Sequence, residues 1–326
     1  MGFQSSICNA VRVLFAVLNV MLLWLLVGTA IAVNVWLWAG GGDLFVRVGQ
    51  LLFGPVGLLL TLGVACWYTK DIGTMDKSSR ILVLGHRGLV GGAIHLKLAQ
   101  MGYAPRHGGR VQTLSQARGN IDDAEYVFFA GGVGGGIAKN LARPADLALG
   151  TMRMLSAVLA GAWERGVERL IWFACACVYP VLDRPATEQD LWGGPLEPTS
   201  RAFAAATLAG IELTRAYNEQ HGTEFLVLCP PTVYGPGDTF SEDGHVLAAM
   251  IRKCHEARVT GAPEVVLWGS GRQRRQFLYV EDLAGAAVEI MHSPTFRACG
   301  PLLNVAGHPA RRLDEVAESV ADVVGY

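Results

Sequence analysis

The stretch that decides the fold of most of this 326-residue chain is Ile81-Leu82-Val83-Leu84-Gly85-His86-Arg87-Gly88-Leu89-Val90-Gly91. A short apolar run, Ile81–Leu84, is followed by three glycines at intervals of three and then by a helix-like segment, Gly92–Met101. Between a strand and a helix, this G-x-x-G-x-x-G spacing lets the backbone approach a pyrophosphate and points the first helical amides at its charge. The pattern predicts a dinucleotide-binding unit.

The segments that follow predict an α/β domain. Apolar runs at Tyr126–Ala130 and Leu170–Ala174 have the length of buried strands, and Ala145–Arg165 between them reads as a long helix. Alternating strands and helices favour a Rossmann-type, doubly wound parallel sheet, which binds ligands at the carboxyl ends of its strands. The glycine-rich run Gly131–Gly136 provides a second place for backbone to lie against a cofactor.

The residues after the loop bear on the choice of cofactor. NAD-binding domains place an Asp or Glu about 20 residues beyond the loop, where it binds the ribose hydroxyl. Here that region, Pro105–Arg110, is basic. Arg87, together with Arg106 or Arg110, suits a 2′-phosphate, so NADP is favoured over NAD. The alternative, that Arg106 and Arg110 are solvated loop charges, stays open.

The first 69 residues predict a membrane hairpin. The whole chain is 51% hydrophobic and 17% charged, and no Asp, Glu, Lys or Arg occurs in Val13–Gly42 or in Val48–Thr69. A helix of about 20 residues crosses a bilayer core. We therefore expect transmembrane helices at about 13–38 and 48–68, a linker at 70–80 and the Rossmann-type domain at 81–326.

Flanking charges indicate an orientation. Two spans return the chain to one side, and Arg12, Lys70, Lys77 and Arg80 flank the outer ends, against Arg47 near the connector. The positive-inside rule then places the domain on the cytoplasmic or matrix side. The alternative is that one apolar run is a cleaved targeting signal or a buried core helix.

Charge and cysteine usage narrow the classes of partner. The formal net charge is -1, from 27 basic and 28 acidic residues, which argues against a nucleic-acid groove. Seven scattered cysteines form no closed disulfide framework and indicate a reducing compartment. Cys175 and Cys177 form a C-x-C pair, but no second Cys/His pair has ligand-like spacing near it, so no metal site is predicted.

Motifs spread over Arg80–Tyr326 resemble a known family. Besides Gly85–Gly91 they are Val133-Gly134-Gly135 with Asn140, Cys177-Val178-Tyr179-Pro180, Gly194–Thr199, Tyr234–Asp238, His245-Val246, His255-Glu256-Ala257, Gly261–Val266, Trp268–Gly271 and Phe277–Leu283. These segments resemble GDP-L-fucose synthase, an extended short-chain dehydrogenase/reductase that epimerises and then reduces GDP-4-keto-6-deoxymannose with NADPH.

The resemblance implies binding residues for both ligands. NADP(H) would lie against Gly85, His86, Arg87, Gly88, Leu89, Val90, Gly91, Arg106, Ala130, Gly131, Gly132 and Pro230. Trp268 and Arg275 match positions that hold the nucleotide sugar, and a guanidinium such as that of Arg275 suits a diphosphate.

The same resemblance exposes a departure at the reacting centre. The family's hydride chemistry uses a Tyr-x-x-x-Lys pair and a Ser, and the matching residues here are Phe203, Thr207 and Cys175. Phe has no proton to give and Thr no charge. Loss of general acid catalysis alone typically costs about 10²–10⁴ in rate, so we expect a catalytically degenerate site.

Two further positions keep the family's residues. Cys177 and His245 match its epimerisation acid/base pair. Because the enolate would need the donor that Phe203 lacks, we favour structural roles: a Cys packed as a small hydrophobe and a satisfied neutral His. The chain also ends at Val323–Tyr326, where the family continues with a further segment, which leaves a small, truncated substrate lobe and argues against a nucleotide-sugar ligand.

These observations lead to two functional hypotheses. The first is a non-catalytic, membrane-anchored NADP(H)-binding accessory subunit, whose partners are the lipid bilayer and other membrane-protein subunits. Respiratory complex I carries an accessory subunit of this superfamily, and this analogy favours the mitochondrial inner membrane. The alternative is a membrane-tethered nucleotide-sugar epimerase/reductase that uses Cys177 and His245.

Overall fold

The computed structural model describes residues 75–132, 135–241 and 244–326. The chain divides into two compact units, Met1–Gly73 and Thr74–Tyr326, and the described residues all belong to the second. The two predicted membrane spans, at 13–38 and 48–68, lie outside the described residues.

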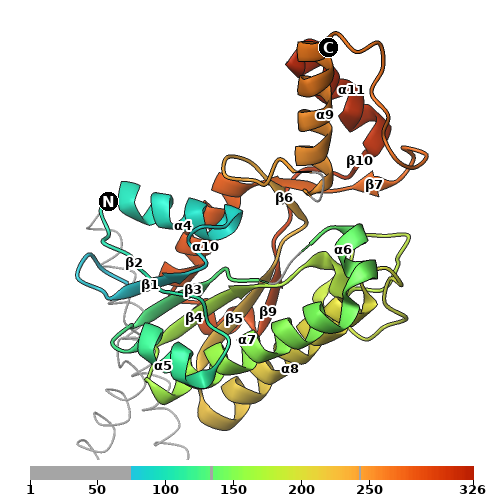
Figure 1. The fold of residues 1–326 in the computed structure, drawn as a ribbon. Coiled ribbons are helices and arrows are strands. Elements are labelled where there is room, and N and C mark those ends of the chain that lie inside the picture. Colours follow the sequence, from blue (N-terminus) through green and yellow to red (C-terminus); the bar gives the residue numbers. More distant parts are fainter. Residues whose placement is uncertain (1–74, 133–134, 242–243) are drawn as a thin grey trace, which may run out of the picture. The chain divides into compact units, whose positions relative to one another are not determined.

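The described unit is built on a parallel sheet of six strands (Figure 1). The strand order is β2-β1-β3-β4-β5-β9. The strands are β1 (Ile81–Leu84), β2 (Arg106–His107), β3 (Tyr126–Phe129), β4 (Arg169–Phe173), β5 (Glu224–Cys229) and β9 (Leu302–Asn304). Because β2 and β3 pair with opposite edges of β1, the order reverses there, as in doubly wound folds. The predicted Rossmann-type sheet is confirmed.

Helices cover both faces of this sheet. Alternate strand residues such as Leu82 and Val127 pack with α5 (Leu114–Ile121), α7 (Pro144–Glu164) and α8 (Arg201–His221). The residues between them, such as Val83 and Phe128, pack with α4 (Leu89–Gln100) and α10 (Val280–His292) on the other face. Successive strand side chains point to opposite faces, and both faces are apolar here, which explains the nearly continuous hydrophobic strands.

Helix boundaries differ slightly from the sequence expectations. α4 begins at Leu89, three residues before the expected Gly92, because Gly88 has extended backbone and serves as its N-cap. α7 has the length and apolar composition of a membrane span, but half of that window is buried inside the domain. It packs against α5 and α8, which identifies it as a core helix.

A second, smaller core follows β5 along the chain. The helices α9 (Val246–Thr260) and α11 (Leu313–Val324) pack through residues such as Leu247, Met250 and Val320. The remaining elements are α6 (Ile137–Ala142), the short strands β6 (Thr232–Tyr234), β7 (Arg274–Arg275), β8 (Phe277–Tyr279) and β10 (Arg311–Arg312), and the 3-10 turns η1 (Ala176–Val178), η2 (Glu188–Asp190) and η3 (Phe296–Cys299). β7 pairs with β10 and β6 with β8.

Part of the segment expected to be a linker is packed against the domain. Met75 is 3% exposed and belongs to the core beneath α4 and α10. The ammonium of Lys77 lies 3.6 Å from the ring centroid of Tyr103 and donates to the carbonyl of Met101. The chain is therefore fixed to the domain from residue 75.

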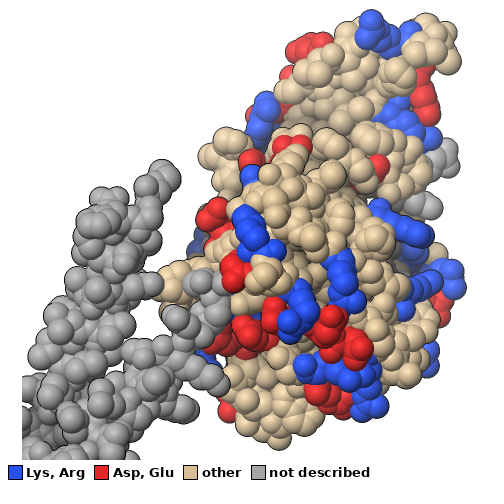
Figure 2. Space-filling view, turned by 90° about the vertical axis from the view of Figure 1, so that its left-hand side faces the viewer, with Lys and Arg blue, Asp and Glu red and all other residues tan. Residues whose placement is uncertain are grey.

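On the face drawn in Figure 2, acidic and basic side chains are interspersed.

Candidate functional site

The glycine loop forms a tight turn at the carboxyl end of β1. Gly85 has φ +88°, and a Cβ there would lie 2.6 Å from backbone atoms of Ala130 and Gly131, which follow β3. The amide of Gly88 donates to the carbonyl of Gly85 at 3.0 Å, and a Cβ on Gly91 would lie 2.3 Å from the same oxygen. Only glycine fits this close approach of two strand ends and a helix.

The turn delivers the chain into the N-terminus of α4. The first turn of this helix, which contains Leu89 and Val90, carries no acidic residue, so its free amides and dipole present uncompensated positive potential. Arg87 is exposed beside it, and Gly131 and Gly132 follow at the same sheet edge. The free amides at this edge give it the positive potential that favours a diphosphate.

Three imidazoles gather next to the loop. The ring of His86 lies 4.2 Å from that of His107, and the ring of His95 lies 6.0 Å from that of His107. Burial lowers the pKa of His86, and the neighbouring His107 and Arg87 lower it further. Sequence reasoning missed His107, since only the pairing of β2 with β1 brings it to the loop.

Arg106 is turned away from the loop. Its guanidinium forms an ion pair of 2.5 Å with Asp123, whose carbonyl accepts a hydrogen bond from the Arg80 side chain just before β1. This contact lies at the amino ends of the strands, opposite the glycine loop. In the structure Arg87, not Arg106, is the basic residue within the loop itself.

Phe203 and Thr207 lie one turn apart on α8, as the resemblance predicts. Thr207 is 3% exposed, and its hydroxyl donates to the carbonyl of Phe203 at 2.9 Å. The one hydroxyl proton is thus used inside the helix. Neither position offers a free donor or a charge to a ligand.

Cys175 and Cys177 lie two residues apart at the carboxyl end of β4, with Cys177 in η1, and both are partly exposed. The pKa of Cys177 is lowered, mainly by the neighbouring Cys175 thiol and further by Ser200. The pKa of Cys175 is raised by the neighbouring Cys177 and by burial.

Glu197 organises the residues around this pair. Its carboxylate accepts hydrogen bonds from the amide of Thr199 at 3.1 Å and from the amide and hydroxyl of Ser200, both at 3.1 Å. The Thr199 hydroxyl also donates to it, which is the main cause of the lowered pKa of Glu197. This carboxylate therefore holds Ser200 at the start of α8, a role that sequence reasoning missed.

Other candidate donors are engaged or shielded. The buried Tyr179 hydroxyl donates to Oδ1 of Asn304 at 2.7 Å, and burial raises its pKa. Cys229, at the end of β5, is 4% exposed, and burial raises the pKa of its thiol to about 12. Pro230, next in the chain, is buried as well.

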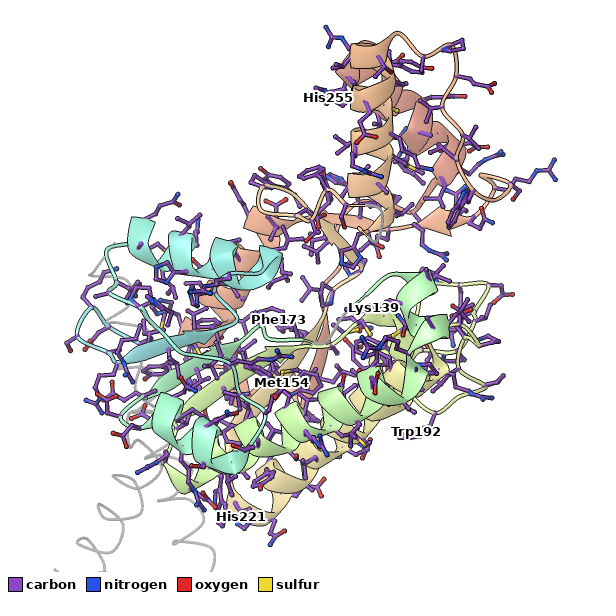
Figure 3. The ribbon with its side chains drawn as sticks, viewed as in Figure 1. Lys139, Met154, Phe173, Trp192, His221 and His255 are labelled. Atoms are coloured by element: carbon purple, nitrogen blue, oxygen red, sulfur yellow. The ribbon has the colours of Figure 1, made fainter. Side chains whose placement is uncertain are left out.

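The residues expected at the sugar belong to the part of the chain beyond β5. His245 is exposed and caps α9, Trp268 is 89% exposed, and Arg275 is exposed on β7. The ammonium of Lys253 lies 5.7 Å from the Trp268 ring centroid. Among the described residues, no hydrogen bond joins any of these three to Cys177. In Figure 3 the label Phe173 marks the end of β4, two residues before Cys175, and the label His255 marks α9, which follows His245.

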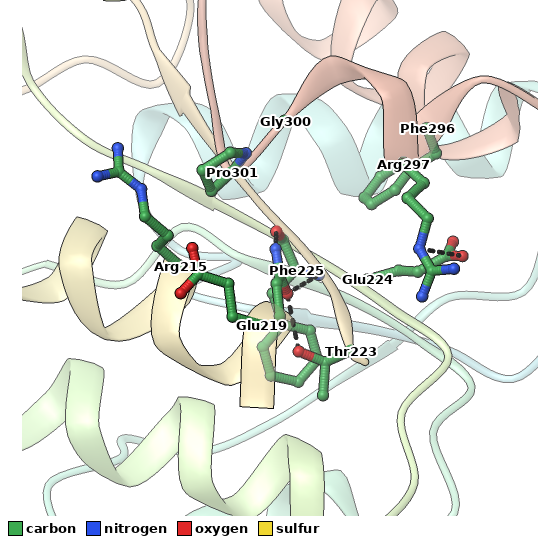
Figure 4. Close-up of a pocket in the computed structure, with 10 residues that line it drawn as sticks. Arg215, Glu219, Thr223, Glu224, Phe225, Phe296, Arg297, Gly300 and Pro301 are labelled. Atoms are coloured by element: carbon green, nitrogen blue, oxygen red, sulfur yellow. Dashed lines mark hydrogen bonds and ion pairs between the residues drawn. The ribbon is translucent and has the colours of Figure 1, made fainter. Parts of the chain in front are cut away.

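A separate cavity of about 280 Å³ lies at the amino end of β5 (Figure 4). It is lined by Arg215, Asn218, Glu219, Thr223, Glu224, Phe225, Phe296, Arg297, Gly300 and Pro301. The carboxylate of Glu224 is bound by Arg169 at 3.0 Å and lies 3.8 Å from Arg297. This cavity is at the edge opposite the glycine loop and is not part of the candidate site.

In the described part of the chain, no three His, Cys, Asp or Glu residues are grouped to hold a metal ion.

Comparisons with known proteins agree with this geometry. Residues 81–306 match the model of the NAD dependent epimerase/dehydratase family. GDP-L-fucose synthase from Escherichia coli (strain K12) is 34% identical over 269 residues, which cover 76% of this chain and 82% of the relative. GDP-L-fucose synthase 1 from Arabidopsis thaliana is 38% identical over 261 residues, which cover 77% and 80%.

Solved structures give the same picture. A GDP-L-fucose synthetase from Naegleria fowleri bound to NADP has a TM-score of 0.70 and 26% identity, and the likeness covers 78% of this chain and 80% of that one. MlghC, a GDP-mannoheptose C4 reductase from Campylobacter jejuni with NADP bound, has a TM-score of 0.70 and 25% identity, with coverage of 77% and 87%. The chain described here belongs to the NAD-dependent epimerase/dehydratase family, and GDP-L-fucose synthases are among its relatives.

Proposed function

We propose that this chain binds NADP(H) and a nucleotide sugar, and that its chemistry is proton exchange beside a ketone, with Cys177 as the base, and not hydride transfer. The observation that carries the proposal is the position of Cys177, which is partly exposed in η1 at the carboxyl end of β4, the sheet edge that also carries the glycine loop. The neighbouring Cys175 lowers the pKa of Cys177, which raises its thiolate fraction, and the thiolate is the form that accepts a proton.

The cofactor edge supports NADP(H). Gly85 and Gly91 allow β1, β3 and the start of α4 to approach one another closely at this edge, the first turn of α4 carries no acidic residue, and Arg87 suits a 2′-phosphate. Relatives in solved structures hold NADP. The nicotinamide of such a cofactor supplies or accepts a hydride when bound.

The reacting centre argues against using that hydride. Reduction of a ketone needs a proton at the oxygen as the hydride arrives. Phe203 has no such proton, and the Thr207 hydroxyl gives its own to the Phe203 carbonyl at 2.9 Å. The cofactor would then serve binding and stability, since a ligand bound only by the folded state stabilises it.

Proton exchange needs no hydride, although the enolate oxygen still needs a proton donor, which must come from a group other than Phe203 and Thr207. The Cys177 sulfur would take the proton from the carbon next to the ketone, and a second group would return one on the opposite face. His245, at the start of α9, is the group that the resemblance assigns to this step. The names of the relatives favour this enzyme hypothesis over a purely structural role.

A second candidate function is favoured by Phe203 and Thr207 together. It is a non-catalytic NADP(H)-binding accessory subunit, anchored by spans at about 13–38 and 48–68 and assembled with other membrane proteins. Its domain would face the cytoplasm or the matrix, and the mitochondrial inner membrane is the concrete version. Nucleic acid is not among the partners proposed.

One experiment separates the two candidates. The full-length protein, purified in mild detergent, is incubated with NADPH and GDP-4-keto-6-deoxymannose in D₂O, while NADPH absorbance and the mass of the sugar are followed. We expect deuterium to enter the sugar without loss of NADPH. Cys177→Ala should abolish the uptake and the matched control Cys299→Ala should keep it.

The other outcomes are equally informative. If neither deuterium uptake nor NADPH loss occurs, the enzyme proposal fails and the accessory subunit is favoured. Rapid consumption of NADPH would contradict both, because it would require a proton donor that Phe203 and Thr207 do not provide.

A further inference from the structure

We propose that His86 and His107 bind the 2′-phosphate of NADP(H) and take up a proton when it binds, so that the choice between NADP and NAD depends on pH. The inference rests on the proposed binding of NADP(H) and adds to it the residues that contact this phosphate.

The fold places His107 where a dinucleotide-binding domain contacts the ribose. In such domains the residue that meets the 2′ position stands about 20 residues beyond the glycine loop. His107 ends β2 at about this distance, and the pairing of β2 with β1 sets it beside Val83. A Cβ on the next residue, Gly108, would lie 2.5 Å from the Leu84 side chain. The chain after β2 is therefore packed against the strand end from which the glycine loop leaves.

The imidazoles of His86 and His107 form one surface beside that loop. Their ring centroids are 4.2 Å apart, and the ring planes are inclined by 38°. His86 is half-buried and His107 is exposed. Within residues 75–132, 135–241 and 244–326, neither side chain makes a hydrogen bond or an ion pair. Their ring nitrogens are therefore available to donate to a ligand.

His95 of α4 completes the cluster. Its ring meets the ring of His107 edge-on, with centroids 6.0 Å apart and planes at 74°. Nδ1 of His95 is buried and has no hydrogen-bond partner in the described part of the chain. The three rings are therefore held by contacts of their faces and edges, and no internal hydrogen-bond network occupies the nitrogens of His86 and His107.

The charged groups around the pair favour an anion. The two segments that carry the pair also carry Arg87 and Arg110, both exposed, and the residues after β3, 130–132, are uncharged. Acidic residues come from α10, which packs against α4 and has Glu281 and Asp282, both exposed, in its first turn. The two imidazoles thus lie between basic groups.

In the free protein, a proton on this pair is unfavourable. Burial lowers the pKa of His86, and the charges of His107, Arg87 and His95 lower it further, with no contribution from an acidic residue. Two imidazoles in contact also cannot both carry a charge without an anion to compensate them.

A bound phosphate reverses this balance. A dianion next to the imidazoles stabilises their charged form, so the pKa of the pair rises on binding and a proton is taken up from solvent. The affinity then increases as the pH falls from the bound pKa toward the free one, by at most about tenfold per pH unit for one proton. Arg87 is charged throughout this range and adds no pH dependence. NAD has a hydroxyl in place of the phosphate and gains nothing from the proton.

The test is calorimetric titration of the full-length protein, in mild detergent and phosphate-free buffer, with NADP⁺ and with NAD⁺. At pH 6.5 and 8.5 the 2′-phosphate keeps most of its double charge, because its second pKa is about 6. We expect NADP⁺ to bind at least ~5-fold more tightly at pH 6.5 than at pH 8.5. Titrations in two buffers of different ionisation enthalpy should show proton uptake with NADP⁺ and none with NAD⁺.

Variants at His107 separate charge from structure. His107→Arg supplies a permanent charge, so it should bind NADP⁺ tightly at both pH values without proton uptake. His107→Gln keeps a donor but cannot be protonated, and at pH 6.5 it should bind NADP⁺ about as weakly as the parent does at pH 8.5. The matched control is His221→Gln, at an exposed imidazole in the last turn of α8, and it should behave as the parent. Because His107 is exposed on an edge strand, these variants should fold, which circular dichroism checks.

Three results would overturn the inference. They are equal affinities for NADP⁺ at both pH values, proton uptake that persists in His107→Arg, and a His107→Gln variant that binds as His221→Gln does. If NADP⁺ binds without a linked proton, the inference fails and the proposed function stands. If NADP⁺ does not bind at either pH, the proposed cofactor fails and this inference fails with it. The absence of deuterium uptake into the sugar would leave these binding measurements unaffected.

Discussion

The hydroxyl of Tyr103 lies 2.8 Å from Nε2 of His292, and this bond joins the segment after α4 to the last turn of α10. The two residues are 189 positions apart in the chain. Tyr103 is also 3.4 Å from the carbonyl of Met75 and lies beneath the ammonium of Lys77. The side chain of Tyr103 therefore links the end of α4 to α10 and to the segment that contains Met75 and Lys77.

Replacing Tyr103 should weaken the contacts that join α4, α10 and the chain segment around residue 75. Tyr103→Phe removes the hydroxyl and leaves His292 without its partner, so we expect the free energy of unfolding to fall by about 1 kcal/mol. Urea denaturation measures the change. Tyr217→Phe is the control, since no hydrogen bond of the Tyr217 hydroxyl is seen in the described structure, and it should be nearly neutral. Equal effects of the two variants would contradict a role for the bond.

His292 should make stability depend on pH. Burial lowers the pKa of His292 in the folded state, with Lys77 and Arg169 adding to burial. The unfolded state therefore binds more protons just below the usual His pKa of about 6.5, and stability falls as pH drops from about 6.5 toward the folded value. Denaturation at pH 7.5 and 5.5 tests this. His292→Gln should reduce the difference, and an unchanged difference would assign it to other groups, such as His86.

Gly85→Ala should damage the cofactor edge. The added Cβ would meet the backbone of Ala130 and Gly131 at 2.6 Å, in addition to the strain of φ +88°. Gly102→Ala is the matched control, because Gly102 has φ +81° but no atom within 4 Å of its Cβ position. Both should lose about 1 kcal/mol through backbone strain, while only Gly85→Ala should weaken NADPH binding, by at least ~10-fold. Fluorescence titration with NADPH measures the affinity of each variant. Equal affinities would contradict the prediction that the backbone packing at Gly85 shapes the cofactor site.

The ion pair of Arg169 and Glu224 should behave as a buried unit. Arg169 is 1% exposed, binds Glu224 at 3.0 Å and the Met291 carbonyl at 2.7 Å, and its guanidinium lies 5.0 Å from the ring centroid of Phe296. Arg169→Ala should cost about 3 kcal/mol, because it removes the nearer cation from a carboxylate that is only 11% exposed, while Arg297 at 3.8 Å still compensates part of its charge.

The double variant Arg169→Met with Glu224→Gln should recover part of this loss, because no uncompensated charge remains. Thermal unfolding of both variants gives the comparison. A double variant less stable than Arg169→Ala would show that the packing around the pair, and not its charge, dominates.

Restoring the missing pair should restore reduction. Phe203→Tyr with Thr207→Lys returns a phenol and an ammonium to one face of α8, and we expect NADPH oxidation with GDP-4-keto-6-deoxymannose to rise on the order of 10² over the parent. Thr207→Val, which removes the hydroxyl but keeps the shape, should give no gain. If the double variant is folded, binds NADPH and remains inactive, then other residues of the site must also be responsible for the absence of hydride transfer.

The sequence predicted what depends on local pattern. The strand, the turn and the helix around Gly85 follow from glycine spacing, and β3 and β4 lie within one residue of the expected strands. The pair Phe203 and Thr207 shares a helix face because four positions make about one turn. The first turn of α4 was missed because Leu89 and Val90 had been counted with the loop.

Contacts between distant segments could not be predicted in this way. Arg106 turns to Asp123 because tertiary packing, and not loop composition, decides which carboxylate it meets. His107 reaches His86 only through the pairing of β2 with β1. The C-x-C motif did not indicate Ser200 as a neighbour of Cys177, because only the fold brings the start of α8 to the end of β4.

The docking of residue 75 has a practical consequence. Met75, Lys77 and Tyr103 hold the incoming chain near the amino end of β1, while Gly85 and Cys177 lie at the carboxyl ends of the strands. The chain ahead of residue 75 therefore enters the domain at the first edge, and a pulling force applied through it would act on the contacts of Met75 and Lys77 before it reached the second edge.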